Sequence, residues 1–269
     1  YRPTRRLISE SFLTADRNRV LENMVVLTGE HAISLALVSV LMTVSWSKDL
    51  LDRGGLVAAF FVGLIVSLLG HWTWMAVLMT FLIVGSIATK WRYEEKVAIS
   101  AEEANDGVRG WKNVLANGGM ASLLAILHYS IGGYEWSYFL LCAAVSVAAS
   151  DTLASEIGSL DPRTRIITTL EAVPAGTNGG MSPTGTLAAF YGALLIAMVS
   201  TILGSVTLDP TPTAFMFVFI TVIGWLGCQV DSLLGALLEN RGFLGKHSVN
   251  FLSTLSGSIL ALIVAMRFL

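Results

Sequence analysis

Long apolar stretches alternate with short polar ones along most of this 269-residue chain. A membrane-spanning helix needs about 20 mostly apolar residues, with roughly 17 as the lower limit. By this measure the chain contains eight candidate spans, of which the fourth and fifth are short and are expected to form a tight hairpin or partial, re-entrant helices. The eight segments are 31–47, 54–70, 72–89, 118–131, 134–149, 183–204, 212–230 and 249–267. The pattern predicts an all-α, polytopic transmembrane helical bundle.

The composition supports an integral membrane protein. Apolar residues make up 54% of the chain and charged residues only 13%, whereas soluble domains carry roughly 25% charged residues. The mean hydropathy is +0.68. No basic face interleaved with aromatic residues is present, so no nucleic-acid partner is expected. Cys142 and Cys228 lie in apolar runs and are expected to be buried thiols, and the four scattered histidines do not indicate a zinc site.

The chain divides into a basic N-terminal segment, residues 1–30, and a single transmembrane domain, residues 31–269. The first segment is expected to be an interfacial helix, with the remnant of a transit-peptide junction as the alternative. The domain includes a charged loop at 90–117, which is expected to form a solvated helix pair. The arginines of the first segment are Arg2, Arg5, Arg6, Arg17 and Arg19.

Eight spans place both termini on one face of the membrane and the larger polar loops on the other. The loops at 90–117, 150–182 and 231–248 share that second face, so one catalytic surface can be assembled from all three. Their basic residues favour this face as the cytoplasmic or stromal one, although the N-terminal arginines argue for the opposite orientation. We expect an integral protein of a prokaryotic plasma membrane or of a thylakoid or plastid envelope membrane.

The polar block from Ser150 to Thr186 interrupts the apolar pattern. It is poor material for a span, because unpaired polar backbone in hydrocarbon is costly, so it is expected at the membrane edge or along a polar cavity. Asp151 directly follows the fifth predicted span. On one helix Asp151 and Glu156 would be about 140° apart, so they can bind one ion only if the helix breaks; otherwise they serve different partners.

A second acidic motif, Asp231-Ser232-Leu233, resembles Asp151-Thr152-Leu153 and follows the seventh predicted span in the same way. The match either records an internal duplication or is due to chance. As a duplication, it would bring two aspartates together around one site, which is a common way to bind Mg²⁺ with phosphate oxygens.

The second half of the block is rich in glycine and threonine and leads into the sixth predicted span. Glycines let backbone N–H groups approach phosphate, and a helix N-terminus adds partial positive charge. Ser182 is expected to be the N-cap of that span, with Pro183 at its first position. No Walker A sequence is present. Arg163 and Arg165 either pair with phosphate or anchor the span to lipid headgroups.

Five motifs in order resemble one integral membrane family. They are VLANGG at 114–119, SDTLASEIG at 150–158, RIITTLEAVPAGTNGGMSPTGT at 165–186, DSLLGA at 231–236 and VNFLS at 249–253. This family includes phytyl-phosphate kinase of vitamin E (tocopherol) biosynthesis and its archaeal, bacterial and animal relatives. The resemblance implies a kinase that transfers the γ-phosphate of a nucleoside triphosphate, CTP or a similar one, to a prenyl monophosphate. The acceptor would be phytyl or geranylgeranyl phosphate and the product its diphosphate.

The family motifs carry over to named positions of this chain. Those expected to bind nucleotide or phosphate are Asn117, Thr152, Ser155, Gly176, Thr177, Gly179, Gly180, Ser182, Ser232, Asn250 and Ser253. The chain departs from the family pattern at Ala172, Glu239 and Lys246-His247, which bears on the exact substrate more than on the chemistry.

The leading hypothesis is therefore a membrane-embedded prenyl-phosphate kinase. Asp151, Asp231 and Glu156 are expected to hold Mg²⁺, while Arg163, Arg165 or Lys246 neutralise developing charge. A cytidylyltransferase of lipid head groups is an alternative enzyme. A lipid or small-solute transporter, or a flippase, is the alternative from another class, and it should place its polar groups at mid-membrane rather than at one face.

Overall fold

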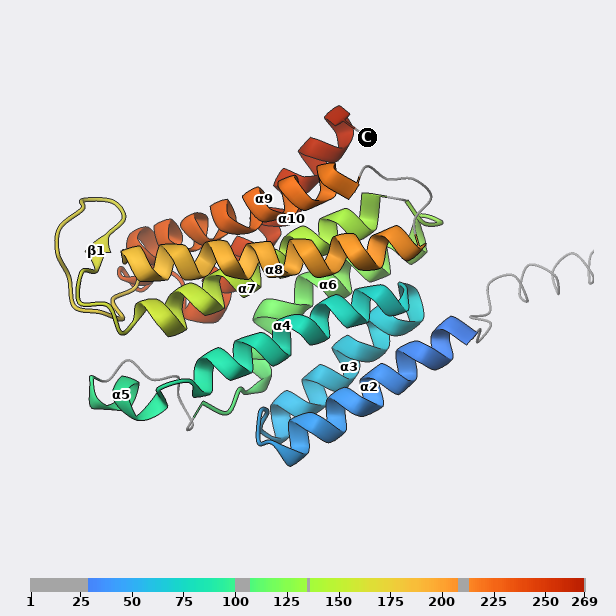
Figure 1. Cartoon of the computed structure of the whole chain (residues 1–269), viewed down its shortest axis with the longest axis horizontal. Helices are drawn as coiled ribbons and strands as arrows, with labels where there is room; N and C mark the ends of the chain where they lie inside the picture. Colours follow the sequence, from blue (N-terminus) through green and yellow to red (C-terminus); the bar gives the residue numbers. More distant parts are fainter. Residues whose placement is uncertain (1–28, 100–106, 135, 208–212, 269) are drawn as a thin grey trace, which may run out of the picture.

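The computed structural model describes residues 29–99, 107–134, 136–207 and 213–268, and within these ranges the chain forms a bundle of long helices (Figure 1). The long helices are α2 (Gly29–Ser47), α3 (Arg53–Leu69), α4 (Trp72–Lys90), α6 (Trp111–Ser130), α7 (Trp136–Gly158), α8 (Pro183–Thr207), α9 (Thr213–Leu234) and α10 (Lys246–Phe268). The short elements are helix α5 (Tyr93–Ala98), strands β1 (Arg165–Ile166) and β2 (Gly180–Met181), and η1 (Gly235–Glu239), a π-helical turn that continues α9. The predicted all-α membrane bundle is confirmed.

Each predicted span falls on one long helix. By length and composition, α2, α4, α7, α8, α9 and α10 can cross a membrane, and α3 is a shorter apolar helix of 17 residues. The fourth and fifth segments form consecutive packed helices, α6 and α7, as expected for the hairpin alternative, but the expectation that they are short was wrong. Helix α6 has 20 residues and α7 has 23, because polar residues at the loop end continue both helices.

The extension of α7 explains why a polar sequence can form a membrane helix. Ser150, Thr152 and Glu156 are all buried, so they face other helices rather than lipid. A helix satisfies its own backbone hydrogen bonds, and polar side chains are tolerated where they face the bundle interior. The first nine residues of the polar block, 150–158, therefore belong to α7 and not to a loop at the membrane edge.

Helix α7 is the central helix of the bundle and packs against α4, α6, α8, α9 and α10. Its neighbours approach closely through small residues: a Cβ atom on Gly227 of α9 would lie 2.2 Å from a methyl group of Val147, and one on Gly257 of α10 would lie 2.6 Å from it. Small residues at such contacts are typical of membrane helix packing. The free thiols Cys142 and Cys228 are buried in this packing, as predicted.

The polar elements gather at one end of the bundle (Figure 1). Helix α5, the β1–β2 hairpin, η1 and the start of α10 all lie at the end where α4, α7 and α9 finish. The predicted charged loop at 90–117 is shorter than expected, because α6 already begins at Trp111, and of the expected helix pair the structure describes only the six-residue α5. Residues 1–28 of the predicted N-terminal segment and residues 100–106 lie outside the described ranges.

The close contact between α7 and α9 predicts the effect of a single methyl group. We expect Gly227→Ala to destabilise the protein by about 1–3 kcal/mol, the usual cost of overpacking, because its Cβ would overlap Val147. Gly245→Ala is the control, since nothing lies within 4 Å of a Cβ there. Thermal unfolding in detergent measures both, and equal stability of the two variants would contradict the packing of α7.

Candidate functional site

A polar cavity of about 270 Å³ opens at the loop end of the bundle, between the ends of α7 and α9, the glycine-rich loop and the start of α10. Most of the predicted site residues line it. These are Asp151, Ser155, Glu156, Gly176, Thr177, Gly179, Gly180, Ser182, Asp231, Ser232, Lys246 and Asn250. Residues from three separate parts of the sequence therefore share one cavity.

Asp151 and Asp231 both line this cavity, close enough for the charge of each to act on the other. Each lies inside its helix rather than after it, which corrects the prediction that the acidic motifs follow the spans. The Asn250 side chain donates a hydrogen bond to Asp151 Oδ2 at 3.4 Å, and the Ser253 hydroxyl contacts Asp231 from behind the cavity. The two matching motifs thus meet from parallel helices.

The aspartate pair suits a hard divalent cation. Asp231 Oδ1 is buried and has no hydrogen-bond partner, and a buried carboxylate oxygen without a partner is costly. Among the described residues, no group of three or more His, Cys, Asp or Glu side chains is arranged to hold a metal. Mg²⁺ needs fewer, because it commonly binds one or two carboxylates and completes its shell with water and substrate phosphates. The donors present therefore fit Mg²⁺ bound together with a phosphate substrate.

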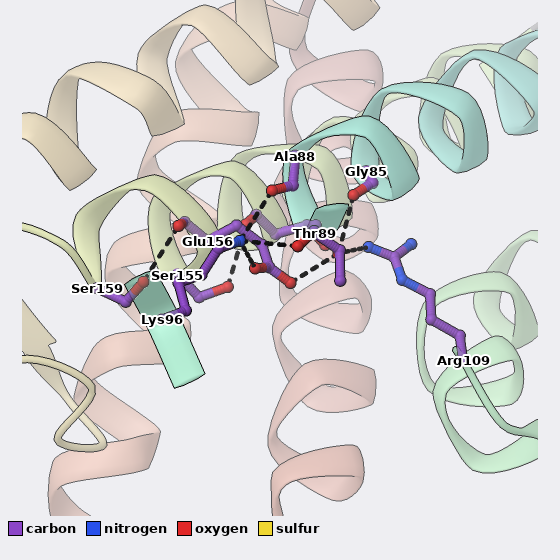
Figure 2. Close-up of polar contacts among 9 residues, drawn as sticks. Gly85, Ala88, Thr89, Lys96, Arg109, Ser155, Glu156 and Ser159 are labelled. Atoms are coloured by element: carbon purple, nitrogen blue, oxygen red, sulfur yellow. Dashed lines mark hydrogen bonds and ion pairs between the residues drawn. The ribbon is translucent and has the colours of Figure 1, made fainter. Parts of the chain in front are cut away.

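Glu156 already has partners inside the protein, and its role as a metal ligand stays a prediction. Its Oε2 accepts a hydrogen bond from Lys96 Nζ at 2.7 Å, and its Oε1 lies 2.7 Å from the Thr89 hydroxyl (Figure 2). Lys96 lies on α5 and Thr89 on α4, so the carboxylate joins three helices. Both of its oxygens have partners inside the protein, which leaves Asp151 and Asp231 as the carboxylates better placed to hold a cation.

Arg163 and Arg165 do not reach the cavity. The Arg163 guanidinium pairs with Asp161, with Nε 2.9 Å from Oδ1 and Nη2 2.9 Å from Oδ2. The Arg165 side chain donates to the Leu170 carbonyl within the hairpin. The structure does not bring them to the cavity, so their role in neutralising the phosphates stays a prediction. Lys246 is the predicted cation that lines the cavity, where it interacts with Glu239.

Asp161 organises the return of the chain into α8. Besides Arg163, it accepts hydrogen bonds from the Thr184 backbone N–H at 3.3 Å and from the Thr184 hydroxyl at 2.8 Å. The Arg163 hydrogen bonds, followed by those from Thr184, hold the pKa of the Asp161 carboxyl well below its usual range. The ionised carboxylate therefore fixes the first turn of α8, directly after the glycine-rich loop.

The glycine-rich loop is held against the helices by close backbone contacts. Strands β1 and β2 pair Arg165 with Met181, and Gly179, at φ +74°, packs directly on α9 and η1, where a Cβ would lie 2.5 Å from the Ala236 Cβ. The Ser182 hydroxyl accepts from the Gly185 N–H at 3.1 Å, which confirms it as the N-cap of α8. Only glycine allows this approach at position 179.

Two further predicted residues face other parts of the bundle. Asn117 borders a separate, small apolar cavity beside α3 and α4, and its side-chain amide donates to the Asn113 carbonyl at 3.0 Å. Thr152 packs towards Gly85 of α4. Neither residue reaches the cavity with Asp151, because helix geometry turns these positions away from it.

Lys96 and Asp161 are site residues that the sequence reasoning missed. Lys96 stands in a stretch of mixed charge, and nothing in its local pattern distinguishes it from a solvated residue. Asp161 offered a usable signal, since Asp-Pro after a helix end favours a turn.

Comparison with known proteins places the chain in a family. The family described as "Integral membrane protein DUF92" matches residues 36–258. The chain belongs to this family. Its DUF92 relatives include the uncharacterized membrane protein MJ0933 of Methanocaldococcus jannaschii, 32% identical over 86% of this chain and 93% of that protein. The uncharacterized membrane protein sll0875 of Synechocystis is 32% identical over 80% of this chain and 83% of that protein.

A third DUF92 relative is the chloroplastic protein VTE6 of Arabidopsis thaliana, which is 32% identical over 80% of this chain and 65% of that protein. No solved structure matches the chain. The family membership expected from the five motifs is confirmed, and it extends across archaea, cyanobacteria and plants.

The Asp161 interactions predict a pH dependence. Because the folded-state pKa is lowered, the ionised group stabilises the protein above its unfolded pKa of about 3.9, and this contribution is lost as the pH falls towards the folded pKa. We expect Asp161→Asn to lower the melting temperature at pH 7 and the difference from wild type to narrow between pH 5 and pH 3. Glu94→Gln, on an exposed turn, is the control. If the difference in melting temperature between wild type and Asp161→Asn stayed constant with pH, the ionised Asp161 carboxylate would not be what stabilises the first turn of α8.

Proposed function

We propose that this protein is a membrane-embedded prenyl-phosphate kinase. It would transfer the γ-phosphate of a nucleoside triphosphate, CTP or a similar one, to a prenyl monophosphate such as phytyl or geranylgeranyl phosphate. The observation that carries the proposal is the adjacent pair Asp151 and Asp231, with a buried, unsatisfied oxygen, in a cavity bordered by a glycine-rich loop. Membership of the DUF92 family supports it, because the five motifs of this chain resemble the integral membrane family that includes phytyl-phosphate kinase.

Asp151 and Asp231 are the residues that would hold Mg²⁺, and Asn250 orients Asp151 through its hydrogen bond. When bound, the cation neutralises negative charge on the transferring phosphates. The loop residues around Gly179 bring backbone groups to the cavity, and Lys246 adds a cationic side chain to its lining. Together these groups bind and orient the polyphosphate, which is most of what phosphoryl transfer demands of a protein.

The acceptor in this reaction is already a phosphate monoester. One of its oxygens forms a bond to the γ-phosphorus as the bond from that phosphorus to the β–γ bridging oxygen breaks, and the nucleoside diphosphate leaves. The attacking oxygen is already an anion near neutral pH, so the chain need not supply a strong general base. Positioning and charge neutralisation carry the rate.

An open apolar groove of about 650 Å³ offers a place for the prenyl chain. It runs between α3, α6 and α10, with Phe61, Gly119 and Phe251 among its lining residues. His247 lines this groove, whereas its neighbour Lys246 lines the polar cavity. The first turn of α10 therefore separates the two, and a lipid in the groove would bring its phosphate to the margin of the cavity.

The alternatives receive less support from this arrangement. A transporter or flippase should place ionisable groups along a path through mid-membrane, whereas the acidic residues of the cavity gather at the loop end of the bundle. A cytidylyltransferase would share the cation and nucleotide site, and the products of the assay below distinguish it from a kinase.

The direct test is an assay of purified protein with geranylgeranyl or phytyl phosphate, each nucleoside triphosphate and Mg²⁺, with prenyl diphosphate as the product measured. We expect Asp151→Asn and Asp231→Asn each to lower turnover at least about 100-fold, because each removes a ligand of the cation. Glu171→Gln, on the exposed hairpin loop, is the matched control and should keep wild-type turnover. Full activity in either aspartate variant, or no diphosphate with any substrate pair, rejects the kinase as proposed.

The groove predicts a dependence on acceptor length. Gly119→Leu extends a side chain into the groove towards Phe251, whose ring would lie 3.5 Å from the new Cβ. Because each buried methylene contributes about 0.8 kcal/mol, we expect about a tenfold higher KM for geranylgeranyl phosphate and little change for dimethylallyl phosphate. Val218→Leu, on an exposed part of α9, is the control. An equal effect on long and short acceptors would place the prenyl chain elsewhere.

A further inference from the structure

Lys96 is a fully buried lysine on the short helix α5, with 0% of its surface exposed. Its ammonium donates to the carbonyl oxygens of Ala88 and Thr89, each at 2.9 Å, and to Glu156 Oε2 at 2.7 Å. Figure 2 shows it reaching from α5 towards Glu156, between the end of α4 and the side of α7. Three acceptors therefore match the three donors of one ammonium group.

Burial of this ammonium is costly unless its charge is compensated. The two carbonyls belong to the last turn of α4, where the helix dipole favours a positive charge. Glu156 supplies the full negative charge. Its other oxygen adjoins the Thr89 hydroxyl, which accepts a hydrogen bond from Arg109 Nη2 at 3.0 Å. The buried network thus contains two cations and one carboxylate.

Glu156 belongs to this network and to the wall of the polar cavity at the same time. The cavity lining contains four carboxyl groups, on Asp151, Glu156, Asp231 and Glu239, but one lysine, Lys246. A bound Mg²⁺ offsets the charge of the Asp151–Asp231 pair, and Lys246 interacts with Glu239. The negative charge of Glu156 is compensated by Lys96, which does not itself line the cavity.

We propose that Lys96 is a positioning residue, which neutralises Glu156 at the cavity wall and thereby allows the cavity to accept the phosphates of a nucleoside triphosphate. The inference rests on the proposed function, because it takes the nucleotide to be the ligand of this cavity. Without Lys96, the Glu156 side chain would keep its negative charge beside the cavity, and Arg109 would act on it only through the Thr89 hydroxyl. Like charges repel strongly at the low effective dielectric of a protein, so this carboxylate would oppose the binding of a polyanion. Lys96 itself does not touch the substrate.

The test measures the Kd of the full-length protein in detergent for Mg²⁺–CTP by equilibrium binding, corrected for the folded fraction. We expect K96M to raise this Kd at least about tenfold, and the double variant K96M/E156Q to return it to within about threefold of wild type, since the repelling charge is then gone. K90M is the control: it removes a lysine of the same face that donates to the Lys48 carbonyl, and it should leave the Kd unchanged. Melting temperatures are recorded for every variant.

The outcomes separate a charge effect from a structural one. Recovery of both Kd and stability in the double variant supports the proposal. A K96M protein that melts lower but keeps the wild-type Kd, or a double variant that is stable but binds as weakly as K96M, overturns it. If K96M does not fold, the double variant K96M/E156Q decides. The proposal requires the double variant to fold and to bind Mg²⁺–CTP, and a folded double variant that does not bind overturns it. Wild-type protein that binds no nucleoside triphosphate instead rejects the proposed function on which the inference rests.

Discussion

Every carboxylate in the interior of a membrane bundle needs a compensating charge or hydrogen bonds, and this requirement determines how the loop end of the protein is built. Glu156 is satisfied by Lys96 and Thr89, from two other helices. Asp161 is satisfied by Arg163 and by the first turn of α8. Asp151 accepts a hydrogen bond from Asn250, but next to it Asp231 keeps one buried oxygen without a partner. Glu156 and Asp161 therefore stabilise the structure, whereas the Asp151–Asp231 pair is the part of this end that we propose to bind a ligand.

The glycine contacts around α7 also determine how this part of the protein is built. They let α8, α9 and α10 approach so closely that the ends of α7 and α9 meet in one cavity. The hydroxyl of Ser146 on α7 donates to the Ile220 carbonyl of α9 at 3.1 Å, which adds a polar contact to the same interface. The placement of two aspartates that are 80 residues apart in sequence thus depends on small residues at the helix contacts, such as Gly227, which directly precedes the cavity residue Cys228. A rigid scaffold of this kind is what a site that works by positioning requires.

The sequence was sufficient to predict the features that depend on pattern. Apolar length identified all eight long helices, and the paired Asp-Ser/Thr-Leu motifs indicated that Asp151 and Asp231 belong to one site. Features that depend on partners distant in sequence were missed. Nothing in the sequence near Glu156 indicates that Lys96, 60 residues earlier, forms an ion pair with its carboxylate. The sequence also suggested that Arg163 binds phosphate. Its ion pair with Asp161 forms only in the folded turn and could not be predicted from the sequence. The extent of α6 and α7 was underestimated because polar residues were taken to end a helix. In α7 such residues are buried and face the interior of the bundle, whereas α6 begins with the exposed residues Trp111 and Lys112.

An experimental structure of the protein with Mn²⁺ and a non-hydrolysable nucleoside triphosphate, in which anomalous scattering locates the metal, decides whether Asp151 and Asp231 form the cation site of a phosphate cavity. We expect one Mn²⁺ between the carboxylates of Asp151 and Asp231, bridged to phosphate oxygens beside the glycine-rich loop. A metal bound at Glu156 in place of Lys96, or a nucleotide bound with no metal at the aspartate pair, would contradict it.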